Sequence, residues 1–243
     1  MSYNRTNPLN PSGSVDTTDY QDTPTSAGSR GVQWTGMSQA TFMSRVLPYF
    51  AGGLLVTAFG AHIGMKIGPG FLLLAIVLNL VFYFALLWNR HAPGLNVALY
   101  YSYTFVNGLL LGPLVLLATK VGGASIIIQA LGLTAVGFFI SAGYVYTTGK
   151  DMSGLGPFLV SGLLVIIIAG LVNIFVGGTG LSLGISILSV FLFMGFTAYD
   201  MSNIMFKFRD NEYMLATIEL YLDFINLFVA LLRILIYIAA RRD

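Results

Sequence analysis

The sequence contains no cysteine and few charged residues, which make up only 9% of its 243 residues. Without cysteine there is no disulfide, no thiolate metal ligand and no cysteine nucleophile. Twelve basic residues against ten acidic residues leave a net charge of +2, and no long basic run is present. These absences exclude thiol chemistry and argue against a nucleic-acid partner.

Hydrophobic residues are abundant instead, at 56% of the chain, together with 28 glycines. This composition is typical of an integral membrane protein. Because a membrane-spanning helix needs about 20 mostly apolar residues, we predict an all-α polytopic fold with seven transmembrane helices. Their ranges are 46–68, 70–88, 97–119, 123–147, 156–177, 181–201 and 217–239.

The start of the chain differs in composition from the rest. Residues 1–38 are rich in Ser, Thr, Asn, Pro, Gly and Asp and contain no apolar run, so we predict a disordered polar tail. Residues 39–243 are then the transmembrane domain. The first thirty residues lack the apolar core of a signal peptide, so the first apolar helix is expected to direct membrane insertion.

Lysine and arginine residues near the ends of the predicted spans indicate the orientation. On the side of the tail they are Arg45, Arg90, Lys150, Lys207 and Arg209, and on the other side Lys66, Lys120, Arg241 and Arg242. Because cytoplasmic loops carry the excess of positive charge, we predict a cytoplasmic N-terminus and an external C-terminus.

The last predicted span carries four polar side chains on one face. Glu219, Asp223, Asn226 and Arg233 are spaced by four, three and seven residues, which at about 100° per residue places them in one narrow stripe. The sixth span has a similar stripe, formed by Ser182, Ser186, Ser189, Thr197 and Asp200. Buried polar stripes in a membrane are expected to face each other.

Asp200 and Asp223 lie at similar distances from the reversal between these two spans, at 202–216, so we expect them at similar depth. Two neighbouring carboxylates in a low dielectric cannot both ionise cheaply, and such a pair tends to share a proton. We predict that the protonated pair holds the helices together and that loss of the second proton favours opening. A structural clasp without transport is the alternative.

Four segments in order resemble the transmembrane Bax inhibitor motif family in its bacterial form. They are FMSRVLPYFAGGLLVTAFGA, YYSYTFVNGLLLGPL, MGFTAYDMSNI and LYLDFINLFVALLRIL, and the resemblance runs from about residue 38 to 240. It implies a central helix surrounded by the other six and a bacterial inner-membrane location. It also implies a pH-sensitive calcium leak in which Asp200 and Asp223 act as proton sensor and latch.

Many members of that family carry a glutamate where this sequence has Asn107, which still offers a carbonyl oxygen. Calcium normally collects six to eight oxygen ligands, more than these side chains supply. We therefore expect calcium as a transported ion, held transiently at Asp200 and Asp223, with no bound cofactor. The predicted pathway lining is Glu219, Asn226, Asn107 and Arg233.

Two other function classes remain open at this point. One is a membrane regulator that binds or inhibits a partner such as a quality-control protease, as the resemblance also implies, with the N-terminal tail available for that contact. The other is an intramembrane aspartyl protease, because TAYD resembles half of such a site. Asp223 follows LYL, however, where those proteases have Gly-x-Gly, and no Pro-Ala-Leu follows. We therefore predict that the chain is not an enzyme.

Glycines recur at four-residue spacing in two predicted spans, as Gly60 with Gly64 and Gly108 with Gly112. Small residues at this spacing allow two helix backbones to approach closely in a membrane. The two pairs therefore predict tight helix packing rather than a binding site.

Overall fold

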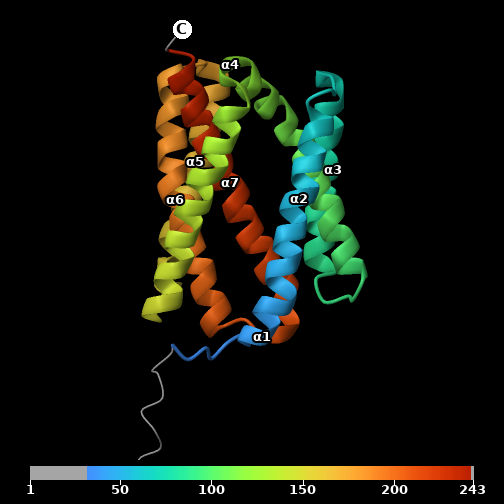
Figure 1. The fold of residues 1–243 in the computed structure, drawn as a ribbon, viewed down its shortest axis with the longest axis vertical. Coiled ribbons are helices and arrows are strands. Elements are labelled where there is room, and N and C mark those ends of the chain that lie inside the picture. The colour runs from blue at the N-terminus through green and yellow to red at the C-terminus, as the bar shows by residue number, and fades with distance from the viewer. Residues whose placement is uncertain (1–31, 242–243) are drawn as a thin grey trace, which may run out of the picture. The chain divides into compact units, whose positions relative to one another are not determined.

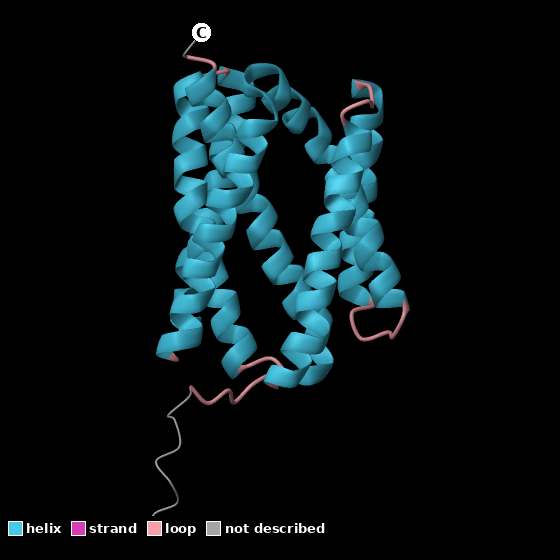
Figure 2. Cartoon of the chain, viewed as in Figure 1, coloured by secondary structure: helices cyan, strands magenta, loops and turns pink. Residues whose placement is uncertain are grey.

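The computed structural model describes residues 32–241, and the regular structure in this range is entirely helical (Figure 2). The all-α prediction is therefore confirmed. The elements are α1 (Gln39–Thr41), η1 (Phe42–Val46), α2 (Leu47–Gly64), α3 (Pro69–Trp88), α4 (Leu95–Thr148), η2 (Ser153–Leu155), α5 (Gly156–Val176), α6 (Thr179–Phe206), η3 (Asp210–Glu212) and α7 (Tyr213–Ala239).

Within the described residues, six helices are long and apolar enough to cross a membrane, so the predicted count of seven is not confirmed. The difference lies in α4, whose 54 residues contain both predicted spans 97–119 and 123–147. The backbone leaves the helical region at Gly122 and Gly123, and Gly123 has a φ of 70°, a conformation that favours glycine. In Figure 1 the two limbs of α4 meet at the top of the view.

We call residues 95–121 the first limb of α4 and residues 124–148 its second limb. A straight helix of this length would extend about 80 Å, far beyond a hydrocarbon core of about 30 Å. The predicted break at 120–123 therefore falls at the two non-helical glycines, and each limb on either side of them is long enough to cross the membrane by itself.

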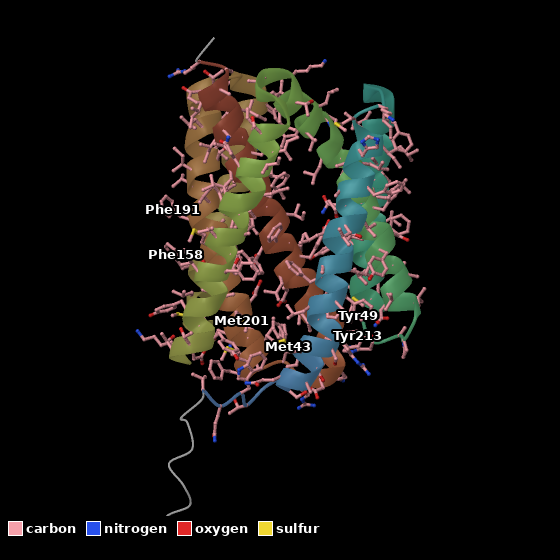
Figure 3. The ribbon with its side chains drawn as sticks, in the orientation of Figure 1. Met43, Tyr49, Phe158, Phe191, Met201 and Tyr213 are labelled. Atoms are coloured by element: carbon pink, nitrogen blue, oxygen red, sulfur yellow. The ribbon has the colours of Figure 1, made fainter. Side chains whose placement is uncertain are left out.

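Helix α7 lies inside the bundle and packs against α2, α4, α6 and η1. Helices α3 and α5 lie further out and carry most of the exposed apolar side chains. Phe158 on α5 and Phe191 on α6 point away from the bundle in Figure 3, with 75% and 70% of their surface exposed. Such faces suit contact with lipid chains. Because α3 packs mainly against α4 and α5 mainly against α6, an arrangement in which all the other helices surround one central helix stays a prediction.

The close helix packing that the glycines predict involves α2 and the first limb of α4. A Cβ added at Gly108 would meet the backbone of Thr57 and Gly60, and one added at Gly112 would meet the backbone of Gly64. The two backbones are therefore in direct contact, and no side chain larger than hydrogen fits between them.

Part of the predicted polar tail belongs to the helical domain. The predicted tail ran to residue 38. Residues 1–31 lie outside the described residues, whereas residues 35–37 bind the end of α6. The amides of Thr35 and Gly36 donate to the Met205 carbonyl, at 3.0 and 2.8 Å, and the amide of Met37 donates to the Ile204 carbonyl. Met37 is fully buried. These bonds satisfy carbonyl groups that the end of a helix leaves free.

The observed helices are longer at one end than the predicted spans. Ser38 caps the first helix, which runs continuously from Gln39 to Gly64, and α6 continues to Phe206. Apolar composition marks only the part of a helix that lies in hydrocarbon, whereas the hydrogen-bonded helix continues into the interface. The described chain starts at the bottom of Figure 1 and ends at the top, while its orientation in a membrane stays a prediction.

Candidate functional site

Asp200 and Asp223 face each other between α6 and α7. The two helices are joined through η3 and pack along each other, so the residues on their facing sides meet at equal distances from the turn. Asp200 is 6% exposed and Asp223 is 3% exposed. Their carboxyl groups lie close enough to share a hydrogen bond. Such a bond requires a proton on one of them, because an ionised carboxylate only accepts.

Glu219 lies one helical turn before Asp223 and adds a third carboxyl group. Its side chain is half-buried, and no N–H or O–H group of the described residues donates to its Oε2 or to Oδ2 of Asp223. A cavity of about 450 Å³ is lined by the three carboxyl groups together with Asn226. The structure thus brings four of the predicted site residues into one cavity.

A second cavity of about 250 Å³ adjoins the first along α7. Both are lined by Asn226, Phe193, Leu163 and Ile167, and the second is also lined by Arg233, Ser186 and Ser189. We call the two cavities together the groove. It lies between α5, α6 and α7, with the acidic residues at one end and Arg233 at the other.

Asn107 lines neither cavity, although it is one of the predicted pathway residues. It sits on the first limb of α4 beside the hydroxyl of Tyr221. Tyr221 and Asp223 are two residues apart on α7, or about 200° around the helix, so they point to opposite sides. Asn107 is therefore separated from the groove by the body of α7.

Sequence reasoning missed the wall that α5 contributes. Leu163 and Ile167 on α5 line both cavities, but apolar residues on an apolar helix carry no signal that distinguishes a cavity wall from a lipid-facing surface. Phe193 interrupts the polar stripe of α6, and it also lines both cavities. An aromatic residue within a polar stripe was the one available hint.

The predicted transient calcium site stays a prediction. Within residues 32–241, no group of three or more His, Asp or Glu side chains has an arrangement that would hold a metal ion. The two contacting aspartates and Glu219 thus form an acidic cavity rather than a closed coordination shell, which normally takes six to eight oxygens for calcium.

Comparison with known proteins gives the family. The family model described as "Inhibitor of apoptosis-promoting Bax1" matches residues 39–241, which is nearly the whole described range. The chain belongs to this Bax inhibitor family. The resemblance that the four sequence segments indicated is therefore confirmed.

Several bacterial proteins are similar to the chain over most of their length. An uncharacterised protein of Helicobacter pylori strain J99 is 30% identical over 198 residues, which cover 80% of this chain and 86% of that protein. The modulator of FtsH protease YccA of Escherichia coli K12 is 33% identical over 180 residues, covering 74% of this chain and 81% of that protein.

A membrane protein of Vibrio cholerae is 41% identical over 136 residues, covering 56% of this chain and 60% of that protein. A protein of another Escherichia coli strain, O6:H1, matches the chain with the same identity and is named inner membrane protein YccA. Together with the six apolar helices, these relatives identify the chain as an integral membrane protein.

Proposed function

We propose that the chain is a membrane-embedded regulator that binds a membrane protease of the FtsH kind and changes its activity. The observation that carries this proposal is the similarity to YccA, a modulator of FtsH protease, over 81% of the length of that relative. The family membership supports it, because the matched residues 39–241 include all the helices that pack around α7. In this function the chain is not an enzyme and acts through a contact with its partner.

The test is reconstitution with the FtsH protease of the same cell. The full chain and the protease are placed in one membrane, and degradation of a fluorescent substrate is measured with and without the chain. We expect the chain to change the degradation rate and to co-purify with the protease in detergent. An unchanged rate together with no co-purification would contradict the proposal.

A matched deletion locates the contact. Removing residues 1–31 keeps residues 35–37, whose amides bind the end of α6, so this variant tests the tail without disturbing the helical domain. If regulation acts through the tail, the deletion abolishes it. If regulation acts through the helices, the variant behaves as the full chain does.

The second candidate function is a proton-sensitive cation leak, and the geometry of the groove favours it. The carboxyl groups of Asp200 and Asp223 lie close enough to share a proton, in a cavity that Glu219 also lines. Loss of the shared proton would place two negative charges in contact and push α6 and α7 apart, so cation flux is expected to rise with pH.

The test uses liposomes that contain a calcium dye, with flux measured between about pH 5 and pH 8 for the parent chain, Asp200→Asn and Asp223→Asn. A flux that depends on pH in the parent and loses that dependence in either variant supports the leak. Flux equal to that of empty liposomes in all three would rule it out. A peptide-cleavage assay on the same samples tests the aspartyl protease class, for which we expect no cleavage.

A further inference from the structure

Two serine hydroxyls that line the groove direct their donor hydrogens away from it. Ser186 donates to the Ser182 carbonyl at 2.9 Å, and Ser189 donates to the Ile185 carbonyl at 2.8 Å. A hydroxyl has a single hydrogen and two lone pairs. Each of these side chains is therefore left with only acceptor capacity toward the groove.

Asn226 also offers an acceptor, from the α7 side of the groove. Its Nδ2 donates to the Leu222 carbonyl at 2.8 Å, and the side chain lines both cavities, so its Oδ1 is the atom left to accept. At the acidic end of the groove, Oδ2 of Asp223 is buried with no donor among the described residues, and the same is true of Oε2 of Glu219. From the acidic end to Ser186, the polar lining offers oxygen acceptors.

A surface of oxygen acceptors favours cations, because carboxylate, carbonyl and hydroxyl oxygens replace the water around a metal ion. The exception in this lining is Arg233, a side chain of the second cavity. It lies ten residues beyond Asp223 on α7, or about 15 Å along the helix. Its permanent charge lies six residues before Ala239, about 9 Å from the end of α7.

We propose that the groove between α5, α6 and α7 is a route for metal cations from the C-terminal end of α7 to the aspartate pair. Arg233 is the electrostatic barrier at the entrance of this route. The proposal rests on the cation-leak candidate and adds the path and the gate. The Arg233 guanidinium repels an entering cation, whereas Asn226, Ser189 and the carboxyl groups beyond it attract one.

The first experiment uses the absence of cysteine in the chain, so that each introduced cysteine is the only one. Ser189→Cys and Val229→Cys place a thiol on the groove lining. Leu188→Cys, on the same helix and 58% exposed toward the outside of the bundle, is the control. Thiols react with methanethiosulfonates as thiolates, which form only where water reaches, so the two groove positions are expected to react and Leu188→Cys is not.

Thiol reagents of opposite charge test whether Arg233 is a barrier to cations. Adding Arg233→Gln to Ser189→Cys is expected to speed modification by a trimethylammonium methanethiosulfonate roughly tenfold, and to leave a sulfonate reagent no faster. Arg233→Lys, which keeps the charge, should retain the slow reaction and also reports whether position 233 tolerates substitution. Equal acceleration of both reagents, or equal reaction at Leu188→Cys, would overturn the proposal.

A measurement of cation flux distinguishes the proposed route through the groove from the cation leak itself. In liposomes, Arg233→Gln is expected to raise calcium-dye influx roughly tenfold, whereas Arg241→Gln, whose guanidinium rests on the Tyr237 ring at the end of α7, should leave it unchanged. If a leak is measurable, Arg233→Gln does not alter it and the groove thiols do not react, the proposed route is wrong, although the protein still conducts cations. Charge-selective groove thiols without any flux refute the leak and leave a cation-accessible groove.

Discussion

The two sides of α7 are built in opposite ways. On one side, α2 meets the first limb of α4 through glycines, with backbone against backbone and no room for a Cβ at Gly108 or Gly112. On the other side, α5 and α6 leave a groove lined by three carboxyl groups and several hydroxyls. Close packing of helix backbones stabilises a fold, whereas buried carboxyl groups reduce stability. The first region is therefore the scaffold, and the second is where function is expected.

The packed side should be the most sensitive to substitution. Gly108→Ala places a methyl group against the Thr57 carbonyl and the backbone of Gly60, and helix backbones cannot shift as a flexible side chain can. We expect a loss of about 2 to 3 kcal/mol or more in the free energy of unfolding, measured by thermal unfolding in detergent. Gly132→Ala on the second limb, where a Cβ meets nothing within 4 Å, is the matched control and should not destabilise the protein.

Tyr221 connects α7 to the packed side and should be the next most sensitive. Thr57 donates to the Thr104 carbonyl at 3.0 Å, so the hydroxyl of Tyr221, 2.6 Å from Thr57 Oγ1, is the donor in their bond. Tyr221→Phe removes that bond within a fully buried site, and we expect a cost of about 1 kcal/mol in the same unfolding assay. A variant as stable as the parent would show that this contact does not help to hold the scaffold.

The groove side should tolerate substitution better than the scaffold. Asp223→Asn keeps the size of the side chain and its ability to hydrogen-bond Asp200 without a shared proton. We expect a stability change of less than about 1 kcal/mol, together with a loss of pH-dependent flux. If Asp223→Asn costs as much stability as Gly108→Ala, the pair is a structural clasp, and the contrast between the two sides fails.

The smallest effect is expected outside the membrane-spanning segments. The backbone N–H of Ser153 donates to Asp151 at 2.8 Å, and the Ser202 hydroxyl adds a further bond at 3.1 Å. These donors hold the pKa of Asp151 below its ordinary value, with the Ser153 bond as the main cause. A carboxyl group with a lowered pKa stabilises the fold above its ordinary pKa of about 3.9, and that contribution disappears as pH falls through the lowered pKa.

The measurement is unfolding of the parent and Asp151→Asn between pH 6 and pH 3. We expect the parent to be slightly more stable at pH 6 and the difference to vanish at the acidic end. The bond fixes the connection between α4 and α5 to Ser202, two residues beyond Asp200 on α6, so the effect reports how firmly the wall of the groove is anchored. A difference that persists at pH 3 would mean that charge is not its cause.

The sequence alone determined the membrane class, the helical fold, the family and the residues of the acidic site. These follow from local properties: apolar runs long enough to span a bilayer, glycine spacing, and polar residues in register on one helical face. The pairing of Asp200 with Asp223 was also predictable, because a short reversal places the ends of α6 and α7 side by side.

Only the tertiary structure decided what surrounds that pair. It showed the two limbs of α4 meeting at a kink, residues 35–37 bound to the end of α6, Asn107 on the far side of α7 and α5 as the wall of the groove. Each of these depends on which helices become neighbours around α7. In a membrane all helices present apolar surface, so apolar residues that face lipid and apolar residues that line a cavity give the same signal in the sequence.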